Sequence, residues 1–447
     1  MAVRKPLLGV CLLLAVGLSA LAGSHVAQTQ RVTSPAADSQ IFLPLVSKLC
    51  GDCYFVDSVS GSDANPGTSE ERPWRTLAPV HTRTFPPGSI VHFKRGSTWT
   101  GGLVINDSGI AGKPITFTTY GSGARPIFTN PGTPDNRTHA VRILADYVIL
   151  EGVMVRNAQA AGVEIAEGSD HNVVRDIEAT DVGMGVVIYG QYNLVTRSYV
   201  HDLHMVRNTP GGNDDYGAMA IVLSDSNNEA SYNQIIRCIA SSYDFGVDGG
   251  AFEWSGTADG NRVHHNWAAN NDGFLEVGGG SARDTVVAYN VSINNGRFSL
   301  IHLDGPFGSD VRNFRVENNT IVENANSDWE GAVFDFNGVP TVDTLLVRNS
   351  IIHAYKRSKI SAQVAFTHNH NLYYLTGGAQ LGFPPDSTEL ITNPLFVDLA
   401  GLNLHLQSSS PAIDAGLALG YTLDYEDRPV PVGAAPDRGA YEYQGSP

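Results

Sequence analysis

The stretch that decides the fold is residues 247–305, which read VDGGAFEWSGTADGNRVHHNWAANND (247–272), GFLEVGGGSARDTVVAYNVSINNGRFS (273–299) and LIHLDG (300–305). Each line carries a short phrase in which a polar residue is flanked by two apolar ones: Phe252-Glu253-Trp254, Leu275-Glu276-Val277 and Ile301-His302-Leu303. Such alternation is typical of a strand with one buried face. If these strands stack, Glu253, Glu276 and His302 point outward in one column.

The same phrase recurs over a long part of the chain. Four further copies complete a set of seven: Val163-Glu164-Ile165, Val186-Val187-Ile188, Ile221-Val222-Leu223 and Phe334-Asp335-Phe336. The middle residues are separated by 23, 35, 31, 23, 26 and 33 positions. Long-period self-similarity indicates a solenoid. The shortest spacing fits one coil of a β-helix, and the longer ones fit coils that carry loops.

A second phrase begins or ends with asparagine in each unit, as in Asn172-Val-Val-Arg175 and Val287-Ala-Tyr-Asn290. Two short strands per unit and no helical period favour an all-β fold, a right-handed parallel β-helix. We interpret the asparagines as hydrogen-bond ladders between coils rather than as ligands. A β-sandwich is the rival, but it predicts turns every 8–12 residues and no long period.

The N-terminal residues have the features of a secretory signal. Arg4 and Lys5 precede an apolar run from Pro6 to Leu18, and Ala20-Leu21-Ala22 supplies a cleavage site. Removal of this segment takes the formal charge from −16 to −18. So acidic a protein is a poor partner for nucleic acids or anionic membranes. We expect a secreted monomer that binds neither.

Cysteines add little. Cys11 leaves with the signal, and Cys50 and Cys53 could pair across a very short loop. With no second pair nearby, a structural role is favoured over a zinc or redox site. Cys238 follows an apolar pair in a repeat unit and is expected to be a buried thiol.

The two ends of the mature chain differ from the repeats. Residues 61–77 read GSDANPGTSEERPWRTL, and the chain ends with SPAIDAG (410–416) and DRGAYE (437–442). Both phrases resemble those of secreted bacterial right-handed parallel β-helix proteins, a group that includes polysaccharide lyases and glycoside hydrolases. The resemblance implies caps at the two ends. The predicted organisation is a signal (1–22), a lead-in (23–49), an N-terminal cap with first coils (50–139), repeats (140–370), and a last coil with a C-terminal cap (371–447).

Acidic residues are concentrated near the middle of the column. Glu253 and Glu276 stack on each other, and Asp248 and Asp272 lie four or five residues upstream of them. Like charges on neighbouring strands are destabilising. A proton, a cation, or pairing with Arg297 and His302 must offset the repulsion, and each of these is a functional signature. A merely solvated acidic face remains the alternative without function.

Two kinds of chemistry use these residues. In a glycoside hydrolase, Glu253 and Glu276 form the carboxylate pair, with Asp272 as a possible member, and a separation of one coil is close to the ~5 Å of retaining enzymes. The pattern does not say which is the acid. No cofactor is needed in this reading.

The alternative is a Ca²⁺-dependent polysaccharide lyase, since lyases of the resembling family hold Ca²⁺ with exterior acids and use Lys or Arg as base. Asp248, Glu253, Asp272 and Glu276 would be the ligands. No lysine lies between Lys113 and Lys356. Arg297 would therefore have to serve as base with His302, although arginine is normally always charged.

Further residues are candidates for binding a polysaccharide or oligosaccharide. The insertion at 201–217 brings Asp215 and Tyr216, and long loops in a compact fold are often functional. Phe274 is expected to face the same side as Glu276, and Asp304 and Asp335 extend the column. Because fold does not imply function, a non-catalytic carbohydrate-binding or surface protein is the hypothesis of another class.

Overall fold

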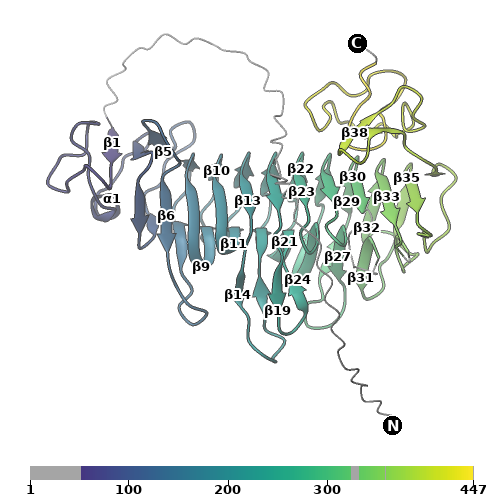
Figure 1. Cartoon of the computed structure of the whole chain (residues 1–447), viewed down its shortest axis with the longest axis horizontal. Coiled ribbons are helices and arrows are strands. Elements are labelled where there is room, and N and C mark those ends of the chain that lie inside the picture. Colours follow the sequence, from purple (N-terminus) through teal and green to yellow (C-terminus); the bar gives the residue numbers. More distant parts are fainter. Residues whose placement is uncertain (1–51, 324–331, 358, 446–447) are drawn as a thin grey trace, which may run out of the picture. The chain divides into compact units, whose positions relative to one another are not determined.

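The computed structural model describes residues 52–323, 332–357 and 359–445. The predicted signal and lead-in lie outside these residues, as does Cys50. Successive parallel strands stack into a parallel β-helix, as predicted (Figure 1). Each coil contributes to three faces, one more than the two strands per unit that the sequence predicted. Within the described residues there is one short helix, α1 (Ala78–Thr82), and no helix long and apolar enough to cross a membrane.

The first face is a continuous parallel sheet. Its strands, in spatial order, are β1 (Cys53–Val56), β2 (Ile90–Lys94), β5 (Ile115–Tyr120), β8 (Val148–Glu151), β10 (Val173–Arg175), β12 (Leu194–Thr196), β17 (Glu229–Ser231), β22 (Arg262–His264), β25 (Val286–Ala288), β29 (Phe314–Glu317), β32 (Leu345–Arg348) and β34 (Thr367–Asn369).

The second face carries the repeated phrase. Its strands are β4 (Leu103–Ile105), β7 (His139–Ile143), β9 (Met154–Ile165), β11 (Glu178–Ile188), β16 (Met219–Leu223), β21 (Gly250–Thr257), β24 (Leu275–Arg283), β27 (Ser299–His302) and β31 (Phe334–Asn337). The short strand β28 (Asp310–Arg312) pairs with the end of β24.

The third face is joined to the second because β9 and β11 each bend through both. Its other strands are β3 (Thr98–Thr100), β6 (Ile127–Asn130), β13 (Tyr199–His201), β18 (Gln234–Ile236), β23 (Trp267–Ala269), β26 (Val291–Ile293), β30 (Thr320–Glu323), β33 (Ile351–Tyr355), β35 (Leu372–Thr376) and β36 (Leu390–Ile391). Three antiparallel hairpins lie outside the coils: β14 (Met205–Arg207) with β15 (Tyr216–Gly217), β19 (Ala240–Ser242) with β20 (Gly246–Asp248), and β37 (Phe396–Asp398) with β38 (Asn403–Leu406).

The interior of the coils is apolar and ordered along the axis. Phe252, Phe274, Phe298 and Phe334 come from successive coils and are almost wholly buried. The rings of Phe274 and Phe298 stack with centroids 4.6 Å apart. Because each buried side chain meets its counterpart one coil away, the repeat pattern itself builds the core.

Buried asparagines form ladders at the corners, as predicted. The Oδ1 of Asn290 accepts the backbone N–H of Asn266, and the Oδ1 of Asn319 accepts that of Asn290, at 3.0 and 2.9 Å. The Nδ2 of Asn290 also donates to the Val263 carbonyl at 3.0 Å. These contacts satisfy backbone groups that the corner removes from the strand ladder. The asparagines are therefore structural.

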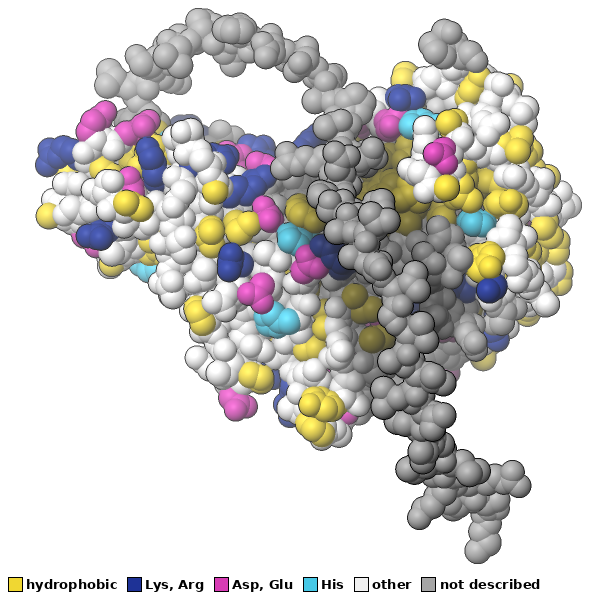
Figure 2. All heavy atoms as spheres, in the orientation of Figure 1, with side chains coloured by type: hydrophobic (Ala, Val, Ile, Leu, Met, Phe, Trp, Pro, Cys, Tyr) yellow, Lys and Arg dark blue, Asp and Glu magenta, His cyan; other side chains and the backbone are white. Residues whose placement is uncertain are grey.

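The exterior of the coils carries ion pairs between neighbours. Arg175 contacts Glu151, and Arg237 contacts Asp202, both at 2.6 Å. Figure 2 shows basic and acidic side chains interspersed on the face turned to the viewer. Each such exposed pair contributes little to stability, ~0–1 kcal/mol. These pairs join opposite charges, whereas the region around Glu253 places acidic residues next to one another.

The N-terminal phrase folds into a tied loop. The Asp63 carboxylate accepts the backbone N–H groups of Arg75 and Thr76 at 2.8 and 2.9 Å, and the Trp74 indole donates to the Asn65 carbonyl. Cys53 is disulfide-bonded. Cys238 is a buried free thiol, as predicted.

The C-terminal phrase covers part of the third face. Tyr441 packs in one apolar cluster with outward-facing residues of β26, β30 and β33, which include Val291, Ile293 and Val322. The guanidinium of Arg438 donates to the carbonyls of Ala415, Asn371 and Thr388. The resemblance implied a cap at the end of the coils; the structure adds a contact along their flank.

Candidate functional site

Glu253 and Glu276 are direct neighbours on the second face. Glu253 of β21 pairs in register with Glu276 of β24, and Val222 of β16 precedes them in the same column. The residues on either side of each glutamate are buried, as shown by Phe252 and Trp254, so both carboxylates point outward. Neighbouring parallel strands lie ~4.8 Å apart. The predicted register of the first five phrases is confirmed.

The sixth phrase was placed wrongly. Glu276 pairs with Leu300, and Leu300 pairs with Asp335, whereas His302 pairs with Asn337. The true phrase in β27 is Ser299-Leu300-Ile301. A shift of two residues keeps each side chain on its face, so alternation alone cannot detect it.

His302 nevertheless reaches the glutamate pair. Its Nε2 lies 3.0 Å from Oε1 of Glu276, and its Nδ1 lies 3.4 Å from Nδ2 of Asn337. Because the Asn337 amide nitrogen is a donor, Nδ1 of His302 accepts in this contact. The ring proton of His302 is therefore on Nε2, which donates it to Glu276. His302 thus holds the Glu276 carboxylate in one orientation.

Asp248, Glu253, Asp272 and Glu276 form what we call the acidic patch. Arg297 contacts two of these acids. The Nη2 of Arg297 lies 3.2 Å from Oδ2 of Asp272 and 3.9 Å from Oε2 of Glu276. The Arg297 and Asp272 side chains are only 13% and 9% exposed. In a pair so shielded from water, each side chain stabilises the charge of the other, because removal of either one would leave a buried charge without a counter-ion.

The carboxyl groups of the acidic patch are not equivalent. Burial raises the pKa of Glu253 to about 8, and the charges of Glu276 and Asp248 add to the effect. Burial likewise raises the pKa of Asp248 to about 7, helped by Glu276. Burial raises the pKa of Asp272 too, but Arg297 opposes the rise. Near neutral pH, Glu253 therefore keeps its proton beside a Glu276 held by His302 and Arg297.

Two further candidate residues lie on the later coils of the column. Asp335 is half-buried, and its Oδ1 accepts the backbone N–H of Phe336. Asp304 is exposed and lies against Gly338, where an added Cβ would approach Oδ2 of Asp304 to 2.6 Å. Phe307 was not singled out by the sequence, yet its ring is 5.8 Å from that of His302 and is 43% exposed.

The prediction for Phe274 is wrong. Its side chain is fully buried and stacks on Phe298 inside the coil. Strand β24 begins at Leu275, so residue 274 belongs to the corner before it. Strict alternation does not continue through a corner, and both Phe274 and Leu275 face inward.

The predicted loop residues have local roles. The Asp215 carboxylate is buried and accepts hydrogen bonds from the Thr209 N–H, the Ser242 hydroxyl and the Asp244 N–H. Tyr216 is half-buried and lies beneath the Arg137 guanidinium, 5.4 Å from the ring centroid. Asp215 therefore ties two hairpins together rather than facing solvent.

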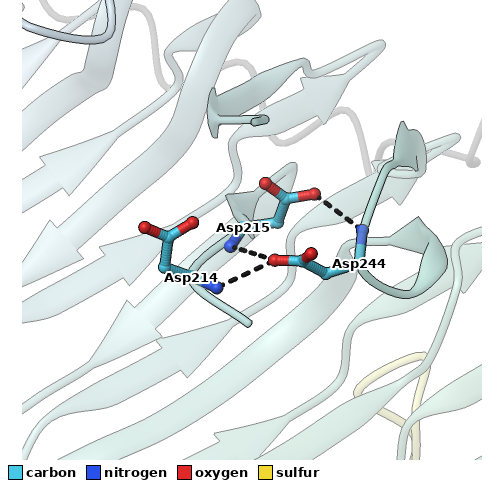
Figure 3. Close-up of side chains that lie close together, drawn as sticks. All are labelled: Asp214, Asp215 and Asp244. Atoms are coloured by element: carbon cyan, nitrogen blue, oxygen red, sulfur yellow. Dashed lines mark hydrogen bonds between the residues drawn. The ribbon is translucent and has the colours of Figure 1, made fainter. Parts of the chain in front are cut away.

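Asp214, Asp215 and Asp244 bring carboxylate oxygens within 4.8 Å of one another (Figure 3). Asp244 accepts the backbone N–H groups of both other residues, at 2.9 and 3.3 Å. Arg207 pairs with Asp214 at 2.5 Å. These contacts account for the cluster as a loop junction. Among the described residues, no three acids of the acidic patch converge to that extent.

Comparison with known proteins agrees with the fold. The crystal structure of pectate lyase Pel9A superposes with a TM-score of 0.59 at 18% identity, covering 87% of this chain and 96% of that one. The complex of XylC with xylose gives a TM-score of 0.54 at 10% identity, covering 72% and 75%. At such identities the likeness concerns architecture.

Sequence relatives match only in part. Lacto-N-biosidase of Bifidobacterium longum subsp. longum is 38% identical over 88 residues, which are 18% of this chain and 6% of that protein. The uncharacterized protein YwoF of Bacillus subtilis is 32% identical over 139 residues, 28% of each. The aligned stretches thus span well under two thirds of either relative. No family model matches the chain.

Proposed function

We propose that the protein is a polysaccharide-active enzyme, a glycoside hydrolase that uses Glu253 and Glu276. The observation that carries the proposal is the pair itself: two outward glutamates in register, one with a pKa raised to about 8 and the other bonded to His302. Neighbouring carboxyl groups whose environments separate their pKa values are typical of an acid and its partner.

The proposal gives each glutamate a role that its surroundings favour. Glu253, which keeps its proton, donates it to the glycosidic oxygen as the bond to the leaving sugar breaks. Glu276, whose side chain is oriented by His302, attacks or stabilises the anomeric carbon. The strands that carry the pair lie ~4.8 Å apart, and this favours the ~5 Å between the carboxyl groups of retaining enzymes over the wider separation of inverting ones. After the first step Glu253 takes a proton from the incoming water.

The related names support a carbohydrate substrate in general. Pectate lyase and lacto-N-biosidase act, by their names, on different sugars through different reactions, so they favour carbohydrate processing without choosing a class. We infer in addition that the protein is secreted and monomeric, because of the signal-like residues 1–22 and the acidic charge. The chemistry proposed needs no metal.

The test is turnover on a panel of plant and microbial polysaccharides, with and without chelator. We expect reducing ends without the ultraviolet absorbance of unsaturated sugars, and full activity in chelator. Glu253→Gln and Glu276→Gln should each lower kcat by about 10²-fold or more. Glu71→Gln, an exposed acid of the N-terminal segment, is the matched control and should retain activity.

Three results would redirect the proposal. Unsaturated products that vanish with chelator would establish a Ca²⁺-dependent lyase, with the acidic patch as ligands and Arg297 as the base. Binding without turnover, unchanged by either glutamine variant, would indicate a carbohydrate-binding protein. Full activity in Glu253→Gln would show that Glu253 is not the general acid.

A further inference from the structure

A hollow of about 590 Å³ lies on the second face, next to the acidic patch on the side of the earlier coils. Its lining includes charged and polar side chains from several coils: Arg142, Glu164, Glu167, Tyr189, Ser224 and Asp225. Thr257, at the end of the strand that carries Glu253, also lines it. The volume lies in the range of small-ligand sites, ~300–1,000 Å³.

The hollow lies near the proposed catalytic pair. Ser224 is part of its lining, and the Ser224 hydroxyl is 2.8 Å from that of Ser255, two residues beyond Glu253. Glu253 is also close enough for its charge to help raise the pKa of Tyr189, after burial, Glu164 and Tyr216. A sugar chain lying across Glu253 would therefore place its next residues in the hollow.

Tyr189 offers a flat surface there. Its side chain is 42% exposed although it follows directly on a buried strand end, Ile188. An exposed tyrosine ring that lines a hollow offers an apolar face of the kind that a sugar ring can stack on. The hydroxyl groups of Ser224 and Thr257 are donors and acceptors of the kind that sugar hydroxyls need.

The charge of the lining disfavours one class of sugar. Among the described residues, Arg142 is the one cationic side chain of the lining, against the carboxylates of Glu164, Glu167 and Asp225. The charge of Arg137 also acts on Tyr189 from outside the lining, which still leaves more carboxylates than cations. Arg142 Nη2 is already 3.0 Å from Glu164 Oε1. Burial alone would raise the pKa of Glu164, but the contacts of His139 and Arg142 lower it to about 2, so Glu164 stays charged. A sugar carboxylate placed here would meet net repulsion.

We propose that this hollow is a subsite for an uncharged sugar residue that stacks on Tyr189, and hence that the substrate is a neutral glycan rather than a polyuronate. The inference rests on the proposed function for the position of the cleaved bond. It goes further by naming the substrate class and a specificity residue, Tyr189.

The experiment is calorimetric binding to the Glu253→Gln protein, in which turnover does not consume the ligand. The neutral probes are xylo-, cello-, galacto- and N-acetyllactosamine oligosaccharides; the charged probes are oligogalacturonate and oligomannuronate, each in chelator and in Ca²⁺. We expect at least one neutral probe to bind and both uronates to bind at least tenfold more weakly. Adding Tyr189→Ala should weaken the neutral probe about five- to tenfold, and Tyr189→Phe by less than about twofold.

Tyr192→Ala is the matched control, because Tyr192 is 53% exposed and its ring stacks on His171, outside the hollow. A uronate that binds more tightly than every neutral probe would overturn the inference, as would unchanged affinity in Tyr189→Ala or no binding by any neutral probe. Hydrolysis of a uronate by the unmodified protein, without unsaturated products, would contradict this inference and leave the proposed function intact. If a neutral probe binds, loses its binding in Tyr189→Ala and is never turned over, this inference stands and the proposed function fails.

Discussion

At the scale of single residues, two glutamates with the same sequence surroundings have different properties. Both occupy the middle of an apolar–Glu–apolar phrase. Glu276 gains a hydrogen bond from His302 and lies near Arg297, whereas Glu253 has the apolar Val222 on one side and Glu276 on the other. Neighbours one coil away, rather than neighbours along the chain, therefore give the two side chains different surroundings and raise the pKa of Glu253.

The raised pKa of Glu253 predicts how stability depends on pH. Between its ordinary value of 4.5 and its folded value of about 8, the folded chain keeps a proton that the unfolded chain releases. The free energy of unfolding therefore falls across this window as pH rises, and the contribution of Glu253 is constant below and above it. The measurement is urea unfolding. The free energy of unfolding of Glu253→Gln should be at least ~1 kcal/mol higher than that of the original protein near pH 8.5 and equal to it near pH 4.5.

Glu71→Gln serves as the control in that series. The pKa of Glu71 is lowered by hydrogen bonds from its own N–H and Ser69, so its variant should gain nothing at high pH. A Glu253→Gln protein that loses stability toward high pH, in parallel with the original protein, would contradict the raised pKa.

At the scale of elements, the corners fix the register of the strands. The apolar phrases alone allow shifts of two residues, as β27 shows. A buried asparagine at a corner has one partner in the coil before and one in the coil after, so a shifted coil would leave backbone groups without partners. The asparagine ladders therefore specify which strand residues meet, including Glu253 with Glu276.

Removal of one asparagine tests this. Asn290→Ala leaves the N–H of Asn266 and the carbonyl of Val263 without their side-chain partners inside the coil. We expect a loss of about 2–4 kcal/mol in the free energy of unfolding. Asn136→Ala, at an exposed turn, should change it by less than about 0.5 kcal/mol. Equal effects of the two variants would show that the ladder adds nothing.

At the scale of the whole molecule, the C-terminal segment shields the third face. Tyr441 packs beside Val291, Ile293 and Ile351, outward residues that would otherwise leave an apolar surface on the coils. Exposed surfaces of that kind favour association. The second face, with the acidic patch and the hollow, has no such cover from Tyr441, and so the two faces have different tasks.

Hydrogen exchange can locate this contact. Tyr441→Ala should lower the free energy of unfolding by about 3–5 kcal/mol and speed amide exchange in β26 and β30 as well as in the last coils. Tyr243→Ala, at an exposed hairpin tip, is the control and should leave these strands unchanged. Faster exchange confined to residues after 370 would contradict the flank contact.

The sequence by itself determined the class of fold, the inward and outward residues of most coils, and the meeting of Glu253 with Glu276, because a repeated phrase maps onto repeated coils. It could not place His302, Phe274 or Tyr189. A two-residue shift preserves alternation, and a corner breaks it, so those positions depend on contacts between coils. The raised pKa of Glu253 was likewise decided only by the tertiary structure, since its burial and the charges of Glu276 and Asp248 come together only when the coils stack.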